Sequence, residues 1–404
     1  RDLARGPHLA RKSRSLATLG MALCWMLSLR RGEKRFAAAL LTATGIAGIG
    51  LAMLYAPPNR IRAMSRTFLI AILLLPLGAW AQAWDEPAPD AAAMQAEAAH
   101  RAHATRVAQA LAKEGGAREL AFAALLRDRL ATAEAPMEAG DAPSRRVPAD
   151  PEAAAWLRAA AARAGEDVLA HQLVLAAADD AALRREMARR WHSAEPGNLV
   201  PLLSLGLPAD ALLSQARRAD DADAHLYSGV RWMRAALARH PPTADEQRAL
   251  ANGELFIADE AAAMAAMAYG AVVALPSYHA LVQACRGTAL QASPTRAADC
   301  RHVATLLADR SDNALGERVG LSMLAELAQR GPERAEVEAR QRRMDWQMQQ
   351  WGRLASQQPR DGAAQFVHLL DDPSIRSERQ LAERVLQEGG VAPEPPQGWR
   401  PPRY

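Results

Sequence analysis

The chain has 404 residues, of which 50% are hydrophobic and 23% are charged, enough apolar material for one large core or two. Its net charge of +4 comes from residues 1–81, where 12 Lys or Arg face 2 Asp or Glu, so residues 82–404 carry −6. An acidic body lacks the basic surface that DNA and RNA bind, which argues against a nucleic-acid partner.

Residues 64–83 have the pattern of a secretory signal peptide. Met64 is followed by a short charged segment, an apolar run over 68–78, and small residues spaced for cleavage over 79–83. This pattern predicts an exported protein, periplasmic or secreted, and makes residues 1–63 a doubtful N-terminal extension.

A second hydrophobic segment, residues 36–56, supports an alternative. It is long enough to cross a bilayer, and the basic cluster over 30–35 precedes it as a cytoplasmic flank would. If residues 1–63 are translated, this segment is a transmembrane helix, and the protein is anchored in the inner membrane with a periplasmic domain. We prefer Met64 as the start, because a complete signal peptide begins there.

Helix formers dominate the chain from Asp90 onward, and the alternation typical of strands is almost absent. The strongest start signals are Asp150 before Pro151 and a capping box of Thr243 and Glu246. The expected helices lie at about 91–113, 117–133, a hairpin after 150 divided near 165, 180–193, 209–219, 223–239, 258–275, 276–287, 294–311, 313–329, 333–356, 362–370 and 375–387.

Short connections between these helices predict an all-α fold of antiparallel helical hairpins, either an irregular α-solenoid or a helical-repeat-like bundle. The predicted organisation is an N-terminal helical pair and linker over 84–149, a helical-repeat-like domain over 150–392, and a proline-rich tail over 393–404.

The stretch Glu195-Pro196-Gly197-Asn198, with the leucines and glycine that follow over 202–206, resembles the start of a tetratricopeptide-type helix across about one repeat. The chain as a whole resembles uncharacterised exported proteins of high-GC gammaproteobacteria. That resemblance implies export and assigns no activity.

Cys285 and Cys300 are the only cysteines after the signal peptide, and an even count in an oxidising compartment predicts a disulfide. They lie near the facing ends of two consecutive helices, which an antiparallel hairpin would bring together. The alternative is a pair of buried free thiols.

Residues 283–287 match the caspase nucleophile pentapeptide letter for letter, and His240 lies 45 residues before Cys285. However, a helical segment precedes this cysteine where caspases have a strand, and Pro241 follows the histidine where they have glycine. The sequence therefore favours the disulfide over a cysteine protease.

The expected helix over 333–356 interleaves basic and aromatic residues, a pattern that can bind a partner or an anionic surface. Together with one residue of the tail, these form the predicted interaction surface: Arg342, Arg343, Trp346, Trp351, Arg353 and Trp399. A proline-rich tail can dock in a partner's groove or pack back on its own body. In the alternative interpretation, the tryptophans lie partly in the core and the arginines are merely solvated.

Other polar clusters have simpler explanations. His100 and His103 share a helix face but lack further ligands for a tight metal site. The pairs at 179–180 and 371–372 are typical of helix and turn capping. We predict no catalytic residue, no metal ligand and no cofactor.

The leading hypothesis is a non-catalytic helical scaffold of the cell envelope that binds a protein or peptide partner. One alternative is an α-helical envelope enzyme acting on peptide or glycan. The other is the membrane-anchored protein described above, which contacts a membrane only through its N-terminal segment.

Overall fold

A computed structural model describes residues 91–134, 150–251, 256–273, 275–291, 295–328, 331–357 and 359–401. The predicted signal peptide, the hydrophobic segment 36–56, the extension 1–63 and nearly all of the linker before Asp150 lie outside these residues. Among the helices that are described, none combines the length and the apolar character needed to span a membrane.

The prediction of an all-α fold is confirmed across the described residues, which contain sixteen α-helices, one 3-10 helix and no strand. The first seven α-helices are α4 (Ala91–Glu114), α5 (Ala117–Glu134), α6 (Pro151–Arg163), α7 (Val168–Ala177), α8 (Ala181–Ala194), α9 (Leu199–Leu203) and α10 (Ala209–Ala216). The others are α11 (Leu226–Ala238), α12 (Ala244–Ala251), α13 (Ala258–Val273), α14 (His279–Ala284), the 3-10 helix η3 (Gly287–Gln291), α15 (Arg296–Arg310), α16 (Ala314–Leu327), α17 (Pro332–Gln357), α18 (Pro359–Asp371) and α19 (Glu378–Glu388).

Side-chain caps explain where the helices begin. Asp150 accepts hydrogen bonds from the backbone N–H groups of the first turn of α6, and Asp180 does the same for α8. Ahead of α12, the backbone N–H of Thr243 donates to Glu246, and the N–H of Glu246 donates back to the Thr243 hydroxyl. Each of these capping residues was predicted from the sequence.

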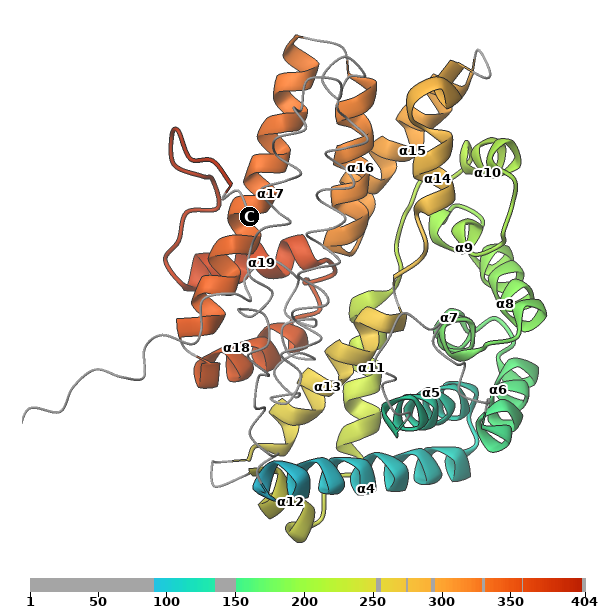
Figure 1. Cartoon of the computed structure of the whole chain (residues 1–404), viewed down its shortest axis with the longest axis vertical. Helices are drawn as coiled ribbons and strands as arrows, with labels where there is room; N and C mark the ends of the chain where they lie inside the picture. The colour runs from blue at the N-terminus through green and yellow to red at the C-terminus, as the bar shows by residue number, and fades with distance from the viewer. Residues whose placement is uncertain are drawn as a thin grey trace, which may run out of the picture.

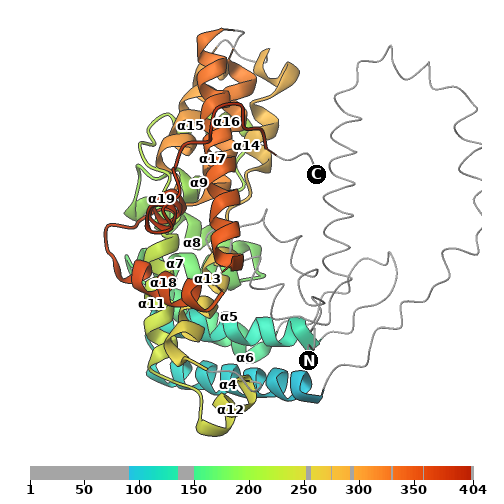
Figure 2. The same cartoon turned by 90° about the vertical axis from the view of Figure 1, so that its left-hand side faces the viewer.

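The helices follow a circuit around the molecule. From α4 to α10 they run from the bottom of Figure 1 up its right-hand side, and α14 to α17 return across the top. Figure 2 shows the same stack from the side. α18 then contacts α11 and α13, so the C-terminal helices pack against helices from the middle of the chain.

Two hydrophobic cores hold the stack together. The first lies among α4–α8, α11, α13, α18, α19 and the end of α17, and its largest buried side chains include Phe122, Trp191, Tyr227, Trp351 and Phe366. The second lies among α9, α10, α14–α16 and the first part of α17. The predicted boundary at 149/150 separates α5 from α6, which pack together within the first core.

The closest helix pair of the second core is α15 and α16, and a glycine permits the approach. A Cβ atom at Gly320 would lie only 2.4 Å from the backbone nitrogen of Ala308 on the facing helix. A larger residue would force the two backbones apart, so the small side chain sets how tightly this hairpin closes.

Two segments differ from the helices expected there. The helix expected over 276–287 is limited to α14, with a 3-10 turn after it. The helix expected from 223 begins only at Leu226, because residues 220–225 form an extended connection with isolated bridges to Asn198 and Ser311. That connection is part of the polar cluster described below.

Candidate functional site

The predicted disulfide is present: Cys285 at the end of α14 is bonded to Cys300 on α15, and their Cα atoms are 5.5 Å apart. Both side chains are inaccessible to solvent, at 1% and 0% exposure. Neither sulfur is therefore available as the thiolate nucleophile of a cysteine protease. His240, the histidine of that alternative, instead lies 2.7 Å from a carboxylate oxygen of Glu114 on α4.

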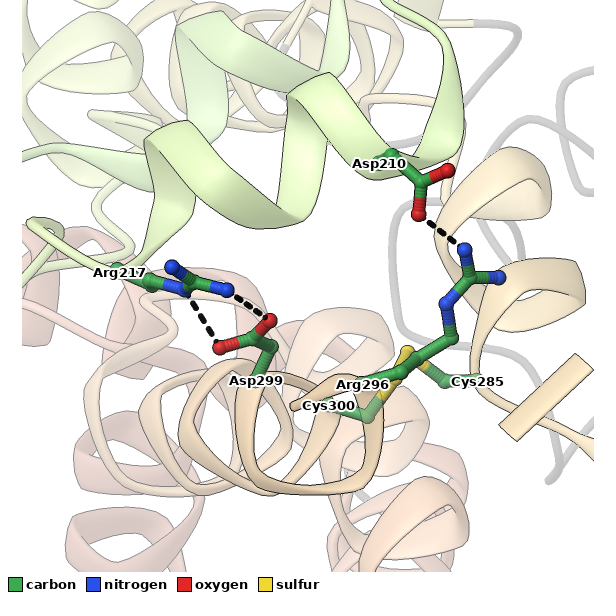
Figure 3. The surroundings of a disulfide bond; sticks show 6 residues. All are labelled: Asp210, Arg217, Cys285, Arg296, Asp299 and Cys300. Carbon is green, nitrogen blue, oxygen red and sulfur yellow. Dashed lines mark hydrogen bonds and ion pairs between the residues drawn. A yellow bond between two sulfur atoms is a disulfide. The ribbon is translucent and has the colours of Figure 1, made fainter. Parts of the chain in front are cut away.

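Ion pairs from α10 flank the disulfide (Figure 3). Arg217 donates from Nε and Nη2 to the two carboxylate oxygens of Asp299, at 2.7 and 2.8 Å. On the other side, Arg296 of α15 pairs with Asp210. The disulfide thus joins α14 to α15, and the two ion pairs join α10 to the same helix.

Loss of the disulfide should destabilise the second core. The Cys285→Ala/Cys300→Ala protein is expected to lose about 3 kcal/mol of unfolding free energy, because the unfolded chain regains the entropy of an open loop. Urea unfolding followed by circular dichroism measures this loss. Reductant should lower the urea midpoint of the unsubstituted protein to about that of the double variant. An unchanged midpoint would contradict a structural role for the bond.

The predicted interaction surface is divided by the structure. Arg342, Arg343 and Arg353 are exposed along α17, and Trp346 is half-buried on the same helix. Trp351 is only 2% exposed and belongs to the first core, so it cannot contact a partner. Five of the six predicted residues therefore remain at the surface.

The face of α17 around Trp346 is covered by residues 391–401 of the same chain, which we name the strap. This segment forms no helix or strand: it bends at 393–394 and turns at 397–398, where the N–H of Trp399 donates to the carbonyl oxygen of Pro396 at 3.0 Å. Trp346 Nε1 donates to the carbonyl oxygen of Ala392 at 2.9 Å, and its ring meets Trp399 edge to face with centroids 5.4 Å apart. Arg343 forms an ion pair with Glu394 at 2.6 Å. Of the two arrangements considered for a proline-rich tail, the described part of the tail packs on its own body.

A second polar cluster, which the sequence analysis missed, lies where α8, α11 and the α15–α16 turn meet. His225, just before α11, has Nε2 at 2.9 Å from Glu195 Oε2 and Nδ1 at 3.6 Å from Asp223 Oδ2. The Glu195 oxygen also accepts hydrogen bonds from Trp191 Nε1 at 2.8 Å and Asn198 Nδ2 at 2.9 Å. We call Glu195, Asp223, His225 and Asp312 the carboxylate–histidine cluster.

The carboxylate of Asp312 anchors the 220–225 connection to the α15–α16 turn. Its two carboxylate oxygens accept the backbone N–H groups of Ala224 and Leu226, at 3.1 and 2.7 Å. His225, between them, has φ = 53°, a left-handed conformation that costs a non-glycine residue about 1 kcal/mol or more. The Asp312 bonds hold this strained turn and set where α11 begins.

The cluster sets unusual proton affinities. Burial alone would raise the pKa of Glu195, but hydrogen bonds from its three donors outweigh it and hold that pKa at about 2. Burial also opposes charge on His225, yet the carboxylates of Glu195 and Asp223 raise the pKa of the imidazole above its ordinary value. Burial beside Asp223 raises the pKa of Asp312 to about 7. The geometry therefore favours a charged histidine bridging α8 and α11.

The imidazolium of His225 should stabilise the fold most in mild acid. Its folded pKa is raised, so its contribution is complete below the ordinary value of about 6.5 and is lost as pH rises through the folded value. His225→Asn keeps a residue that tolerates the left-handed turn but removes the charge. We expect the destabilisation by this substitution to be larger at pH 5.5 than at pH 8.5.

Urea unfolding at the two pH values measures the difference, and comparison with wild type at each pH cancels the titration of groups that do not interact with His225. The matched control is His368→Asn at an exposed position of α18, which should change the free energy of unfolding little. An equal cost of His225→Asn at both pH values would show that folding does not raise the pKa of the imidazole.

The remaining candidates do not assemble a metal site. His103 Nε2 lies 2.9 Å from the carbonyl oxygen of His240, which precedes α12. Within the described residues, no group of three or more His, Cys, Asp or Glu side chains is placed to bind a metal ion. Asp372 accepts hydrogen bonds from the backbone and hydroxyl of Ser374, the turn-capping role expected from its sequence.

Comparison of the chain with models of known protein families, with curated proteins and with solved structures gives no match. The two polar regions must therefore be interpreted from their own geometry. In the carboxylate–histidine cluster, Glu195 and Asp312 are already bonded to several protein donors, which suits a structural junction. The face of α17, by contrast, binds a proline-rich segment of the same chain.

Proposed function

We propose that this chain is an exported protein of the cell envelope that acts as a helical interaction scaffold and holds a protein or peptide partner on α17. The observation that carries the proposal is the contact between α17 and the strap. Here Trp346 and Arg343 bind a largely exposed, proline-rich segment through a carbonyl oxygen and a carboxylate. The same groups suit a segment of another protein.

Two features support the compartment. The signal-peptide pattern over 64–83 predicts export, and a buried disulfide such as Cys285–Cys300 is typical of oxidising compartments outside the cytoplasm. The intact mass of the protein from the envelope fraction tests this. We expect a chain beginning near Gln82 or Trp84 that gains two hydrogens on reduction. A chain that includes residues before Met64 and carries free thiols would support the membrane-anchored alternative.

Site-specific crosslinking in cells tests the scaffold itself. A photoreactive amino acid replaces exposed Arg342 on α17, and a matched control carries it at exposed Leu315 on α16. We expect one reproducible adduct from position 342 that is absent from position 315 and lost when Trp346→Ala is added. Equal labelling from both positions, or no adduct from position 342, would contradict a partner site on α17.

A further inference from the structure

The strap begins at Val391, which packs against the first core, and beyond it side chains of one short stretch of α17 bond the strap. The side chains that bond it are Arg343, Trp346 and Gln347, the last donating from Nε2 to the carbonyl oxygen of Pro393 at 3.4 Å. Two of these contacts involve only main-chain carbonyl groups, which every peptide has. The ion pair of Arg343 requires an acidic side chain in the peptide. The ring contact of Trp346 requires an aromatic one.

Proline explains why such a segment forms no helix. Pro393, Pro395 and Pro396 fix φ and remove backbone donors. The carbonyl of Pro393 accepts from Gln347, whereas that of Pro396 accepts the N–H of Trp399 within the strap. A proline-rich peptide also loses little conformational entropy on binding, which is why aromatic faces commonly recognise this class of ligand. The α17 face supplies the complementary indole, amide and guanidinium groups.

Most of the strap is exposed to solvent, so another peptide can displace it from α17. Ala392, Pro393, Glu394, Pro396 and Gln397 are all exposed, and only three strap residues are half-buried: Val391, Pro395 and Trp399. Immediately before the strap, Gly390 has φ = 64° and forms a turn at the end of α19. A segment with few buried contacts opens at low cost, while the helices beneath it stay folded.

We propose that the strap-covered face of α17 is a binding site for proline-rich peptides carrying an acidic residue and a downstream tryptophan, and that the strap is its intramolecular competitor. This inference rests on the proposed function and names the class of partner. Because the strap is tethered, its effective concentration at α17 is on the order of millimolar, and a free peptide must compete with it. Weakening the strap should therefore strengthen binding of the free peptide.

The experiment uses the full chain and a fluorescein-labelled synthetic peptide with the sequence of residues 391–401, followed by fluorescence anisotropy. The open variant carries Glu394→Lys and Trp399→Ala, which remove the ion pair and the ring contact of the strap. We expect it to bind the peptide at least about tenfold more tightly than the unsubstituted chain. The control Gln397→Ala, at an exposed strap position, should bind like the unsubstituted chain.

Two further substitutions, one in the chain and one in the peptide, show which groups make the binding contacts. Adding Trp346→Ala to the open variant should abolish binding, as should replacing the tryptophan of the peptide by alanine. Circular dichroism confirms that each variant keeps its helical content. An open variant that is folded but binds no peptide would overturn the inference and leave the strap a purely structural segment.

The strap of a second copy of the chain is the other segment that could bind this face of α17. If strap exchange between copies occurs, light scattering will show a dimer of the unsubstituted chain that the open variant does not form, and the inference of a separate partner is overturned. A specific adduct at position 342 together with no peptide binding would leave the scaffold proposal standing and reject only the proline-rich partner.

Discussion

Replacing Trp351 by alanine should cost about 4 kcal/mol of unfolding free energy, the typical loss for a fully buried tryptophan. The side chain is 2% exposed and lies in the first core, where α17 meets α18 and α19. Truncation removes its apolar contacts and leaves a cavity that the surrounding helices cannot fill. Urea unfolding monitored by circular dichroism gives the free energy.

The same substitution five residues earlier provides the control. Trp346 is on the same helix but half-buried, and it forms a hydrogen bond and a ring contact with the strap. Trp346→Ala should cost about 1 kcal/mol, the scale of one hydrogen bond and one aromatic contact. Similar costs for the two substitutions would mean that Trp351 is not a core residue, and would return it to the interaction surface.

Asp312→Ala should also cost about 4 kcal/mol, for a different reason. The two backbone N–H groups that its carboxylate accepts, from Ala224 and Leu226, would stay buried without partners, at about 1–3 kcal/mol each. The strained turn at His225 would lose its support at the same time. Thermal or urea unfolding detects the change.

A nearby carboxylate shows what an exposed aspartate contributes. Asp309 pairs with Arg340 at 2.7 Å near the end of α15, but its side chain is 46% exposed. Asp309→Ala should change the free energy by about 0.5 kcal/mol or less, as surface ion pairs usually do. If Asp312→Ala costs no more than this control, the carboxylate does not hold the 220–225 connection.

Local patterns in the sequence predicted much of this fold. The capping residues Asp150 and Asp180 and the capping box before α12 mark helix starts that the structure reproduces, because a cap acts within one turn. The disulfide was predictable for a related reason, since its cysteines are 15 residues apart in one hairpin.

Helical periodicity also contained the signal for Trp351. Met344, Met348 and Trp351 are spaced by four and three residues, so they share one face of α17, and the structure packs that face inward. Trp346 lies on another face of the helix. Interleaving of basic and aromatic residues alone does not separate the two tryptophans, whereas their spacing relative to the methionines does.

The carboxylate–histidine cluster could not be predicted in the same way. Its members come from the end of α8, the 220–225 connection and the α15–α16 turn, so sequence separations of up to 117 residues divide Glu195 from Asp312. The dense run of aspartates before His225 was the one local hint that a turn, not a helix, occupies residues 220–225. Which buried carboxylate supports that turn depends on how distant helices pack.

One helix makes the two cores interdependent. Along α17, Met344 is buried in the second core and Trp351 is buried in the first. Met348, between them, packs against both cores. Melting either core would therefore strip apolar cover from the other along a single continuous helix. The described part of the chain should lose its structure in one cooperative transition, so that a destabilising substitution in either core lowers the stability of both.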